Sequence, residues 1–440
     1  GFDFTGTQGT LTFAPGQTLL TVAVPINDDA EPETTESFSL RLSAPGGGVL
    51  GRSQGTGFIA ASDQVSQSNP LATVRAGAAG ESDGFLEFVI ELAAPTDKIA
   101  TVTATTADIS ASRFSDYLTT QFAVSFNPGE TARVIRVPLT GDSTLERTEI
   151  LGMGLSGAVN LVAGGDGYGT IFDNDANTGN AVISLHDQVI DEGDAFARVL
   201  ISLDRPSATP ITVRVATGSG TALSEVDYAG IERDIIFAPG QMVQTFTVPV
   251  FNDDDAEQDE QFVVTLSNPS AGSLGRSSGS VLIGRSDLPN SPSPIVSTRT
   301  VTVGEADPSA PLVVQLSAPA AVRTFVDVQT SDQSGSRFSD YLTLSDRIFF
   351  EPGQTTRVVP VSVTEDTTVE TAELVLLSMS APSGLALGSV GNLIIRDNDA
   401  NGTVGIAIGD AIVNEGEGFA VLPVWLTAPA ANLLTVDFGV

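Results

Sequence analysis

The stretch "TFTVPVFNDDDAEQDEQFVVTLS", Thr245 to Ser267, joins two different patterns. At both of its ends apolar and polar residues alternate, which is typical of half-buried β-strands. Its centre, Phe251 to Phe262, has six carboxylates among twelve residues and no Lys or Arg. Crowding like charges into one loop costs free energy unless a cation joins them. The stretch therefore predicts two strands connected by a loop that needs a cation.

The chain repeats itself. The turn "FAPGQ" at Phe237 has counterparts at Phe13, Phe126 and Phe350, so successive copies are almost evenly spaced. An Asp recurs at positions 63, 175, 287 and 399, which is a constant interval. A period twice as long separates "SRFSDYLT" at Ser112 from its copy at Ser336. Two types of repeat therefore alternate along the chain, so that the first resembles the third and the second resembles the fourth. Each repeat has about the size of a β-sandwich domain.

These markers divide the chain into five parts. We expect three complete repeats, each with seven strands that we label A to G. Residues 1–63 would hold strands D to G of a further repeat, and residues 400–440 would hold strands A to C. The complete repeats would be residues 64–175, 176–287 and 288–399. We count the part at residues 1–63 as the first repeat, so these three are the second, third and fourth.

The expected fold class is all-β, with sandwiches in tandem. No segment shows helical periodicity, whereas short alternating runs lie between Pro, Gly, Asp and Asn. In the third repeat seven strands are predicted, at residues 181–185, 195–203, 211–217, 233–237, 244–251, 261–267 and 278–284. Their core-facing residues would be Ile211, Val213, Val215, Phe246, Val248, Val250, Phe262, Val264 and Leu266.

Composition argues against several functions. A formal net charge of -34 repels nucleic-acid phosphates and anionic lipids. We find no apolar run of about 18 residues that could insert into a membrane, and no signal peptide opens the sequence. With no Cys and one His, nucleophilic catalysis has little material, and the carboxylates recur in every copy as structural sites do. We therefore expect a protein that is not an enzyme.

The acidic segments are predicted to meet at one end of each sandwich. If consecutive strands run antiparallel, the A–B, C–D and E–F loops and the residues after strand G share one pole. In the third repeat these positions hold "DEGD" at Asp191–Asp194, Asp227, the acidic stretch 252–260 and Asp287. Oxygen ligands in this number, without His or Cys, favour Ca²⁺, which takes six to eight oxygens in irregular geometry, over Mg²⁺. The carboxylates outnumber the needs of one ion, so several ions are expected at each pole.

The order of motifs, "DEGD…LS.P…DY…FAPGQ…V..NDD..E..E.F.V.LS.P…DND", resembles the Calx-beta domain along essentially the whole chain. That family includes domains of sodium–calcium exchangers, integrin subunit β4 and many bacterial surface proteins. The resemblance implies seven-stranded immunoglobulin-like β-sandwiches that bind Ca²⁺ at their distal loops.

The same resemblance implies a ligand set for every copy. For the third repeat it is Glu192, Asp227, Asp253, Asp254, Glu257, Glu260 and Asp287. For the second it is Glu81, Asp116, Asp142, Glu146, Glu149, Asp173 and Asp175. For the fourth it is Glu305, Asp340, Asp366, Glu370, Glu373, Asp397 and Asp399, with Glu365 added. For the first it is Asp28, Asp29, Glu33, Glu36 and Asp63, with Asp3 added.

Two departures from the family pattern bear on affinity. "DNDAN" closes the second and fourth copies, whereas "SDQ" and "SDL" close the first and third. The second copy has "GDST" where the family has paired acids. Fewer ligands suggest fewer or weaker ions, and we expect sites whose affinity alternates along the chain.

We expect a calcium-rigidified segment of an extracellular fibre, surface scaffold or adhesin stalk, with Ca²⁺ bound at several junctions between repeats. Two alternatives stay open: an adhesin module that binds a glycan or protein ligand, and a regulatory calcium sensor. The partial repeats at the ends have two explanations. The chain is an excerpt of a longer array, or it is a subunit that polymerises head-to-tail into a filament by completing its neighbour's split repeat.

Overall fold

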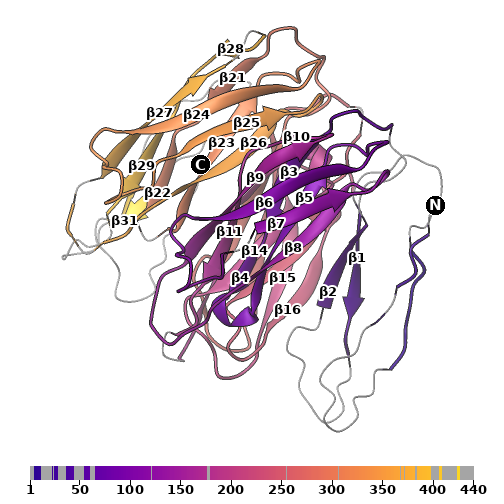
Figure 1. Ribbon diagram of the computed structural model, residues 1–440. Helices are drawn as coiled ribbons and strands as arrows, with labels where there is room; N and C mark the ends of the chain where they lie inside the picture. Colours follow the sequence, from indigo (N-terminus) through magenta and orange to yellow (C-terminus); the bar gives the residue numbers. More distant parts are fainter. Residues whose placement is uncertain are drawn as a thin grey trace.

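The computed structural model shows an all-β protein (Figure 1), as expected. The only helices among the described residues are two 3-10 turns, η1 (Glu81–Asp83) and η2 (Glu192–Asp194), and none is long and apolar enough to cross a membrane. The structure describes residues 4–10, 22, 24–27, 36–43, 54–59, 65–119, 121–175, 179–253, 255–305, 307–366, 368–370, 372–381, 384–397, 406–408 and 424–426.

The third repeat is a sandwich of two sheets. One sheet has the order β17-β14-β12-β19 and the other the order β13-β20-β18-β15-β16. The strands are β12 (Val182–Leu185), β13 (Gln188–Asp191), β14 (Phe196–Leu203), β15 (Ile211–Ser219), β16 (Glu232–Phe237), β17 (Val243–Pro249), β18 (Glu260–Ser267), β19 (Ser273–Leu274) and β20 (Ser278–Gly284).

All seven strands predicted for this repeat are present within two residues at each end. Two short strands were missed, β13 and β19. The chain leaves one sheet at the end of β12, passes His186 and Asp187, and joins the other sheet as β13, where it pairs in parallel with β20. This crossing delivers Glu192, immediately after β13, to the end of the second sheet.

The second and fourth repeats have the same two-sheet architecture. In the second repeat the strands are β3 (Leu71–Ala76), β4 (Ala78–Gly80), β5 (Phe85–Leu92), β6 (Ala100–Asp108), β7 (Gln121–Phe126), β8 (Ala132–Pro138), β9 (Glu149–Val159), β10 (Val162–Ala163) and β11 (Gly167–Phe172). In the fourth they are β21 (Ile295–Thr298), β22 (Val301–Gly304), β23 (Ser309–Leu316), β24 (Thr324–Asp332), β25 (Ser345–Phe350), β26 (Thr356–Ser362), β27 (Glu373–Ser380), β28 (Ala386–Leu387) and β29 (Asn392–Arg396).

The described parts of the two partial repeats are small. They contain a sheet of β1 (Glu36–Arg41) with β2 (Gln54–Ile59) and a separate sheet of β30 (Ile406–Ile408) with β31 (Val424–Leu426). The boundaries of the five parts stay a prediction.

The predicted core positions of the third repeat are confirmed. All nine core-facing residues named from the alternation are at most 5% exposed. Phe262 also stacks on Tyr228, with 4.1 Å between the ring centroids, and both rings are fully buried. Burying these side chains is the main favourable contribution to the stability of each sandwich.

The repeated "FAPGQ" motif forms a tight turn after a buried Phe. In the third repeat the backbone N–H of Gln241 donates to the carbonyl of Ala238 at 3.0 Å, and Gly240 has φ +79°. Pro at the second position and a Gly with positive φ at the third are the signature of a type II turn. The matching glycines, Gly129 and Gly353, also have positive φ, which explains why this motif recurs.

Replacing Gly240 by Ala is expected to destabilise the third repeat by about 1 kcal/mol, because an L-residue is strained at positive φ. No heavy atom lies within 4 Å of the added Cβ, so backbone strain alone should act. Gly218 also has open space around its Cβ but no positive φ, and Gly218→Ala is the matched control. Denaturant unfolding measures both; equal midpoints for the two variants would contradict this account.

Candidate metal centres

Carboxylates from separate loops converge at one pole of each described repeat. Among the described residues, five groups have ligand oxygens within 4.8 Å of one another, and each group takes all its residues from a single repeat. The second repeat contributes Glu81–Asp173–Asp175 and Asp116–Glu146–Glu149, the third Asp227–Glu257–Glu260, and the fourth Glu305–Asp366–Glu370 and Asp340–Glu370–Glu373.

Regular elements place these side chains. Glu149, Glu260 and Glu373 are the first residues of β9, β18 and β27. Glu81 opens the turn η1 directly after β4, and Asp173 follows β11. Because β4 and β11 are parallel neighbours, Glu81 and Asp173 leave the same end of one sheet side by side.

The C–D loop aspartates are held by their own loops. The backbone N–H of Leu223 donates to Asp227 Oδ2 at 2.6 Å, and Ser112 and Ser336 bind Asp116 and Asp340 in the same way. These three aspartates are buried. The hydrogen bond to one carboxylate oxygen thus fixes the orientation of each aspartate. Each of these side chains belongs to one of the five carboxylate groups.

The carboxylates disturb one another strongly. Burial and the neighbouring Asp175 raise the pKa of Glu81 to about 8. Burial and Asp116 raise the pKa of Glu149 to about 8, and burial and Asp340 do the same for Glu373. In the third repeat burial and Asp227 raise the pKa of Glu260 to about 7. These four groups therefore disfavour full ionisation unless a positive charge is brought in.

Buried oxygens without a hydrogen-bond donor show that these residues fit a cation. Glu81 Oε1 and Asp175 Oδ2 in the second repeat, and Glu192 Oε2 and Glu260 Oε2 in the third, are buried and have no hydrogen-bond partner. Leaving a buried carboxylate oxygen unpaired is costly. An all-oxygen donor set of this kind suits a hard divalent cation, Ca²⁺ in particular.

The groups account for fourteen of the predicted ligands, namely Glu81, Asp116, Glu146, Glu149, Asp173, Asp175, Asp227, Glu257, Glu260, Glu305, Asp340, Asp366, Glu370 and Glu373. Predicted ligands that are described but stand outside the groups are Glu36, Asp142, Glu192, Asp253, Asp287, Glu365 and Asp397. Outside the described residues lie Asp3, Asp28, Asp29, Glu33, Asp63, Asp254 and Asp399.

Some of the ungrouped residues still border a pole. Asp142 adds to the negative charge that acts on Glu81. Glu192 lies close enough to Glu257 and Asp287 for both to raise its pKa, which burial brings to about 7. Glu365 pairs instead with Arg147 of the second repeat, an ion pair that joins the poles of two repeats.

The number of groups differs between repeats in an unexpected way. Among the described residues the second repeat has two groups despite its "GDST" loop, and the third has one. The third repeat carries Arg285 at the position where the second repeat has Asp173 and the fourth has Asp397. Our reading of the sequence missed Arg285, although comparing the repeats position by position would have revealed it.

The chain matches a family of domains and several known proteins. Residues 1–63, 72–167, 171–284 and 290–399 match the family model of the Calx-beta domain. The human "FRAS1-related extracellular matrix protein 2" is 25% identical over 91% of this chain, and "Extracellular matrix protein 3" of Lytechinus variegatus is 26% identical over 61% of it. The chain spans 14% and 9% of the lengths of these two relatives.

Solved structures of Calx domains also match. The calcium binding domain CBD12 of CALX1.1 is 19% identical, with 49% of this chain and 99% of that chain covered and a TM-score of 0.25. The apo-form Calx CBD1 domain is 29% identical, with 24% and 97% covered and a TM-score of 0.23. The family model by itself covers four successive segments that make up most of the sequence, so the chain belongs to the Calx-beta domain family.

Proposed function

We propose that this chain is a calcium-binding structural segment of an extracellular scaffold. The observation that carries the proposal is the set of five convergent carboxylate groups, with buried oxygens that lack donors. The relatives support the setting, because their names describe extracellular matrix proteins. Millimolar calcium outside cells fills even weak sites.

Calcium would act on the exit from a repeat. In the second repeat Asp173 and Asp175 lie in the segment that leaves β11 for the next repeat, and Glu81 lies on η1 of the same pole. An ion held by these three residues would tie the exit segment to the body of the sandwich. Fixing a segment that leads from one domain to the next removes hinge freedom, so calcium binding would stiffen the array.

A structural role explains the acids better than catalysis does. The groups recur with the same residue types in successive repeats, as a repeated structural element does. Head-to-tail self-association into a filament, a glycan or protein ligand as for an adhesin, and a role as a calcium sensor stay predictions, because no described contact bears on them.

Calorimetric titration with Ca²⁺ tests the proposal. Glu370 belongs to both groups of the fourth repeat, whereas Glu257 belongs to one group. Glu370→Gln is therefore expected to weaken two sites and Glu257→Gln one, each by roughly tenfold or more, since losing even an outer-shell partner of a metal ligand costs about 10- to 100-fold.

The exposed Glu232, which pairs with Arg214, serves as the control, and Glu232→Gln should leave the titration unchanged. Absence of calcium binding by the native chain, or the same loss from all three variants, would refute the proposal. The native chain should also resolve at least two affinity classes, because the repeats differ in their groups.

A further inference from the structure

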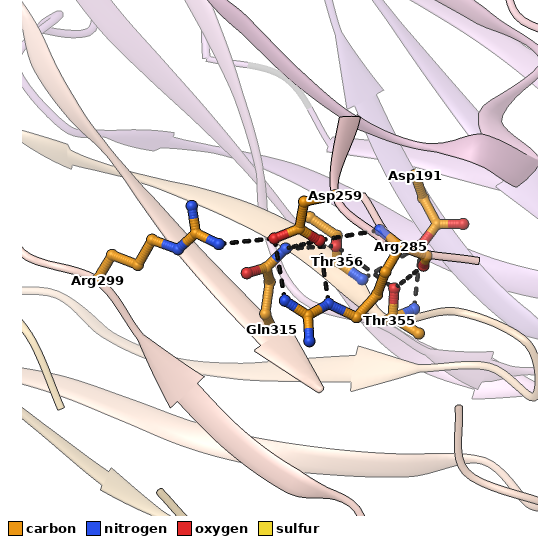
Figure 2. A network of polar contacts seen from close by, with 7 residues as sticks. All are labelled: Asp191, Asp259, Arg285, Arg299, Gln315, Thr355 and Thr356. Carbon is orange, nitrogen blue, oxygen red and sulfur yellow. Dashed lines mark hydrogen bonds and ion pairs between the residues drawn. The ribbon is translucent and has the colours of Figure 1, made fainter. Parts of the chain in front are cut away.

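The third and fourth repeats meet through a polar network centred on Asp259 (Figure 2). The side chain of Asp259 is 0% exposed. It accepts hydrogen bonds from Arg285 Nε at 3.0 Å within its own repeat, and from Arg299 NH2 at 2.6 Å and Gln315 Nε2 at 3.0 Å in the fourth repeat. Burial alone would raise the pKa of Asp259, but the two arginines outweigh it and the pKa is lowered.

A second set of contacts lies beside the first. Asp191 Oδ2 accepts the backbone N–H groups of Thr355 at 3.0 Å and Thr356 at 3.2 Å. The Thr355 hydroxyl donates to the carbonyl of Arg285, and Figure 2 shows both sets of residues side by side. Gly284 permits this approach, because an added Cβ would lie 2.1 Å from Thr356 Oγ1.

We call these seven residues the polar junction: Asp191, Asp259 and Arg285 from the third repeat, and Arg299, Gln315, Thr355 and Thr356 from the fourth. Asp191, Asp259, Gln315, Thr355 and Thr356 are all buried. The junction is complete without a metal ion, because each carboxylate has its donors from protein groups. Buried charges with full sets of partners hold a defined geometry.

The junction between the second and third repeats has the same arrangement but another chemistry. There β4 contacts β17, just as β13 contacts β26 at the polar junction. Phe172 belongs to the core cluster of the third repeat, and Ala78 packs against that cluster, which includes Met242 and Val243. The residues that precede Glu81 and Glu149 are Gly80 and Thr148, where the third repeat has Asp191 and Asp259 before Glu192 and Glu260.

Arg285 links this difference to the carboxylate groups. The matching Asp173 belongs to the group Glu81–Asp173–Asp175 of the second repeat. In the third repeat the side chain of Arg285 is only 14% exposed, and its guanidinium pairs with Asp259. A fixed cationic side chain therefore stands where the second repeat has one of the three carboxylates of a candidate cation site.

We propose that the third repeat has exchanged one cation site for a binding surface whose partner is the fourth repeat, and that this pair stays rigid without calcium. Repeats 176–287 and 288–399 then act as one rigid unit, while calcium controls the exit of the second repeat, where Asp173 and Asp175 belong to a carboxylate group. The array would alternate between junctions that do and do not respond to the ion.

Distances between spin labels on the full chain test this proposal. The sequence has no Cys, so introduced cysteines are unique labelling sites. Ala208→Cys with Ala321→Cys spans the polar junction, and Lys98→Cys with Ala208→Cys spans the preceding one; all three positions are exposed. The 208–321 distance distribution is expected to be narrow and unchanged when EGTA replaces calcium, whereas the 98–208 distribution should broaden.

Variants separate the polar junction from general stability. Asp259→Thr combined with Arg285→Asp copies Thr148 and Asp173 of the second repeat, and should abolish the narrow 208–321 distance in EGTA. Arg299→Gln is a milder variant, to be used if the double variant does not fold. It removes one donor from the fourth repeat and leaves Arg285 on Asp259, so it should broaden the 208–321 distance distribution in part. Arg214→Ala, which removes an exposed arginine paired with Glu232 and Asp234, is the control and should change nothing.

A 208–321 distribution that broadens in EGTA in the native chain would overturn the proposal. A distribution that stays narrow in EGTA both in the Asp259→Thr, Arg285→Asp variant and in Arg299→Gln would also overturn it. This outcome is distinct from failure of the calcium sites, which the calorimetric titration of Glu370→Gln measures separately.

Discussion

Replacing Asp259 by Ala is expected to lower the free energy of unfolding by about 3–5 kcal/mol, the usual cost of removing one partner from a buried ion pair. The reason is the two guanidinium groups that the substitution would leave without their carboxylate. Arg285 is 14% exposed and Arg299 is 29% exposed, so water can solvate neither fully. Gln315 would lose the same acceptor inside the junction. Calorimetric unfolding of the full chain in EGTA measures the change without a contribution from calcium.

The control is Asp234, an aspartate whose partner arginine is exposed to solvent. Asp234 pairs with Arg214 at 3.1 Å, and its side chain is 54% exposed. Because exposed ion pairs contribute about 0–1 kcal/mol, Asp234→Ala should barely change stability. If Asp259→Ala were equally mild, the arginines of the junction would have found other partners, and the junction would not depend on this carboxylate.

Saturating calcium is expected to raise the melting temperature of the second repeat by about 10 °C for each ion bound. An ion present at about 100 times its dissociation constant stabilises the folded state by about 2.7 kcal/mol. A change of about 1 kcal/mol shifts the melting temperature of a domain of about 100 residues by roughly 4 °C. The carboxylates of the unfolded chain no longer converge, so the binding energy is added to the folded state alone.

Scanning calorimetry of the chain in EGTA and in millimolar CaCl₂ measures this shift. Mg²⁺ at the same concentration is the control and should give a smaller shift, because it requires near-ideal octahedral geometry and gives up water reluctantly. The transitions of the second and fourth repeats should move further than that of the third, which has a single group among the described residues. Identical thermograms with and without calcium would mean that the acidic poles are stable without an ion.

The sequence determined the repeat, the strands and the direction in which their side chains point. Alternation with period two is local, so Phe246, Val248 and Val250 could be placed in the core from three positions of one segment. The Pro-Gly turn could be placed for the same reason, since Gly240 alone supplies its positive φ. The convergence of the acids at one pole also followed from strand order, because antiparallel neighbours bring alternate loops to the same end.

Only the tertiary structure decided which acids converge with other carboxylates and which face an arginine. Asp259 lies in the same acidic loop as Glu257 and Glu260, and nothing in the local pattern distinguishes it from them. Its partners Arg299 and Gln315 lie 40 and 56 residues further along the chain, in the next repeat. A carboxylate ionises and binds according to the charges that the folded chain brings within a few ångströms of it, and these charges come from elements distant in sequence.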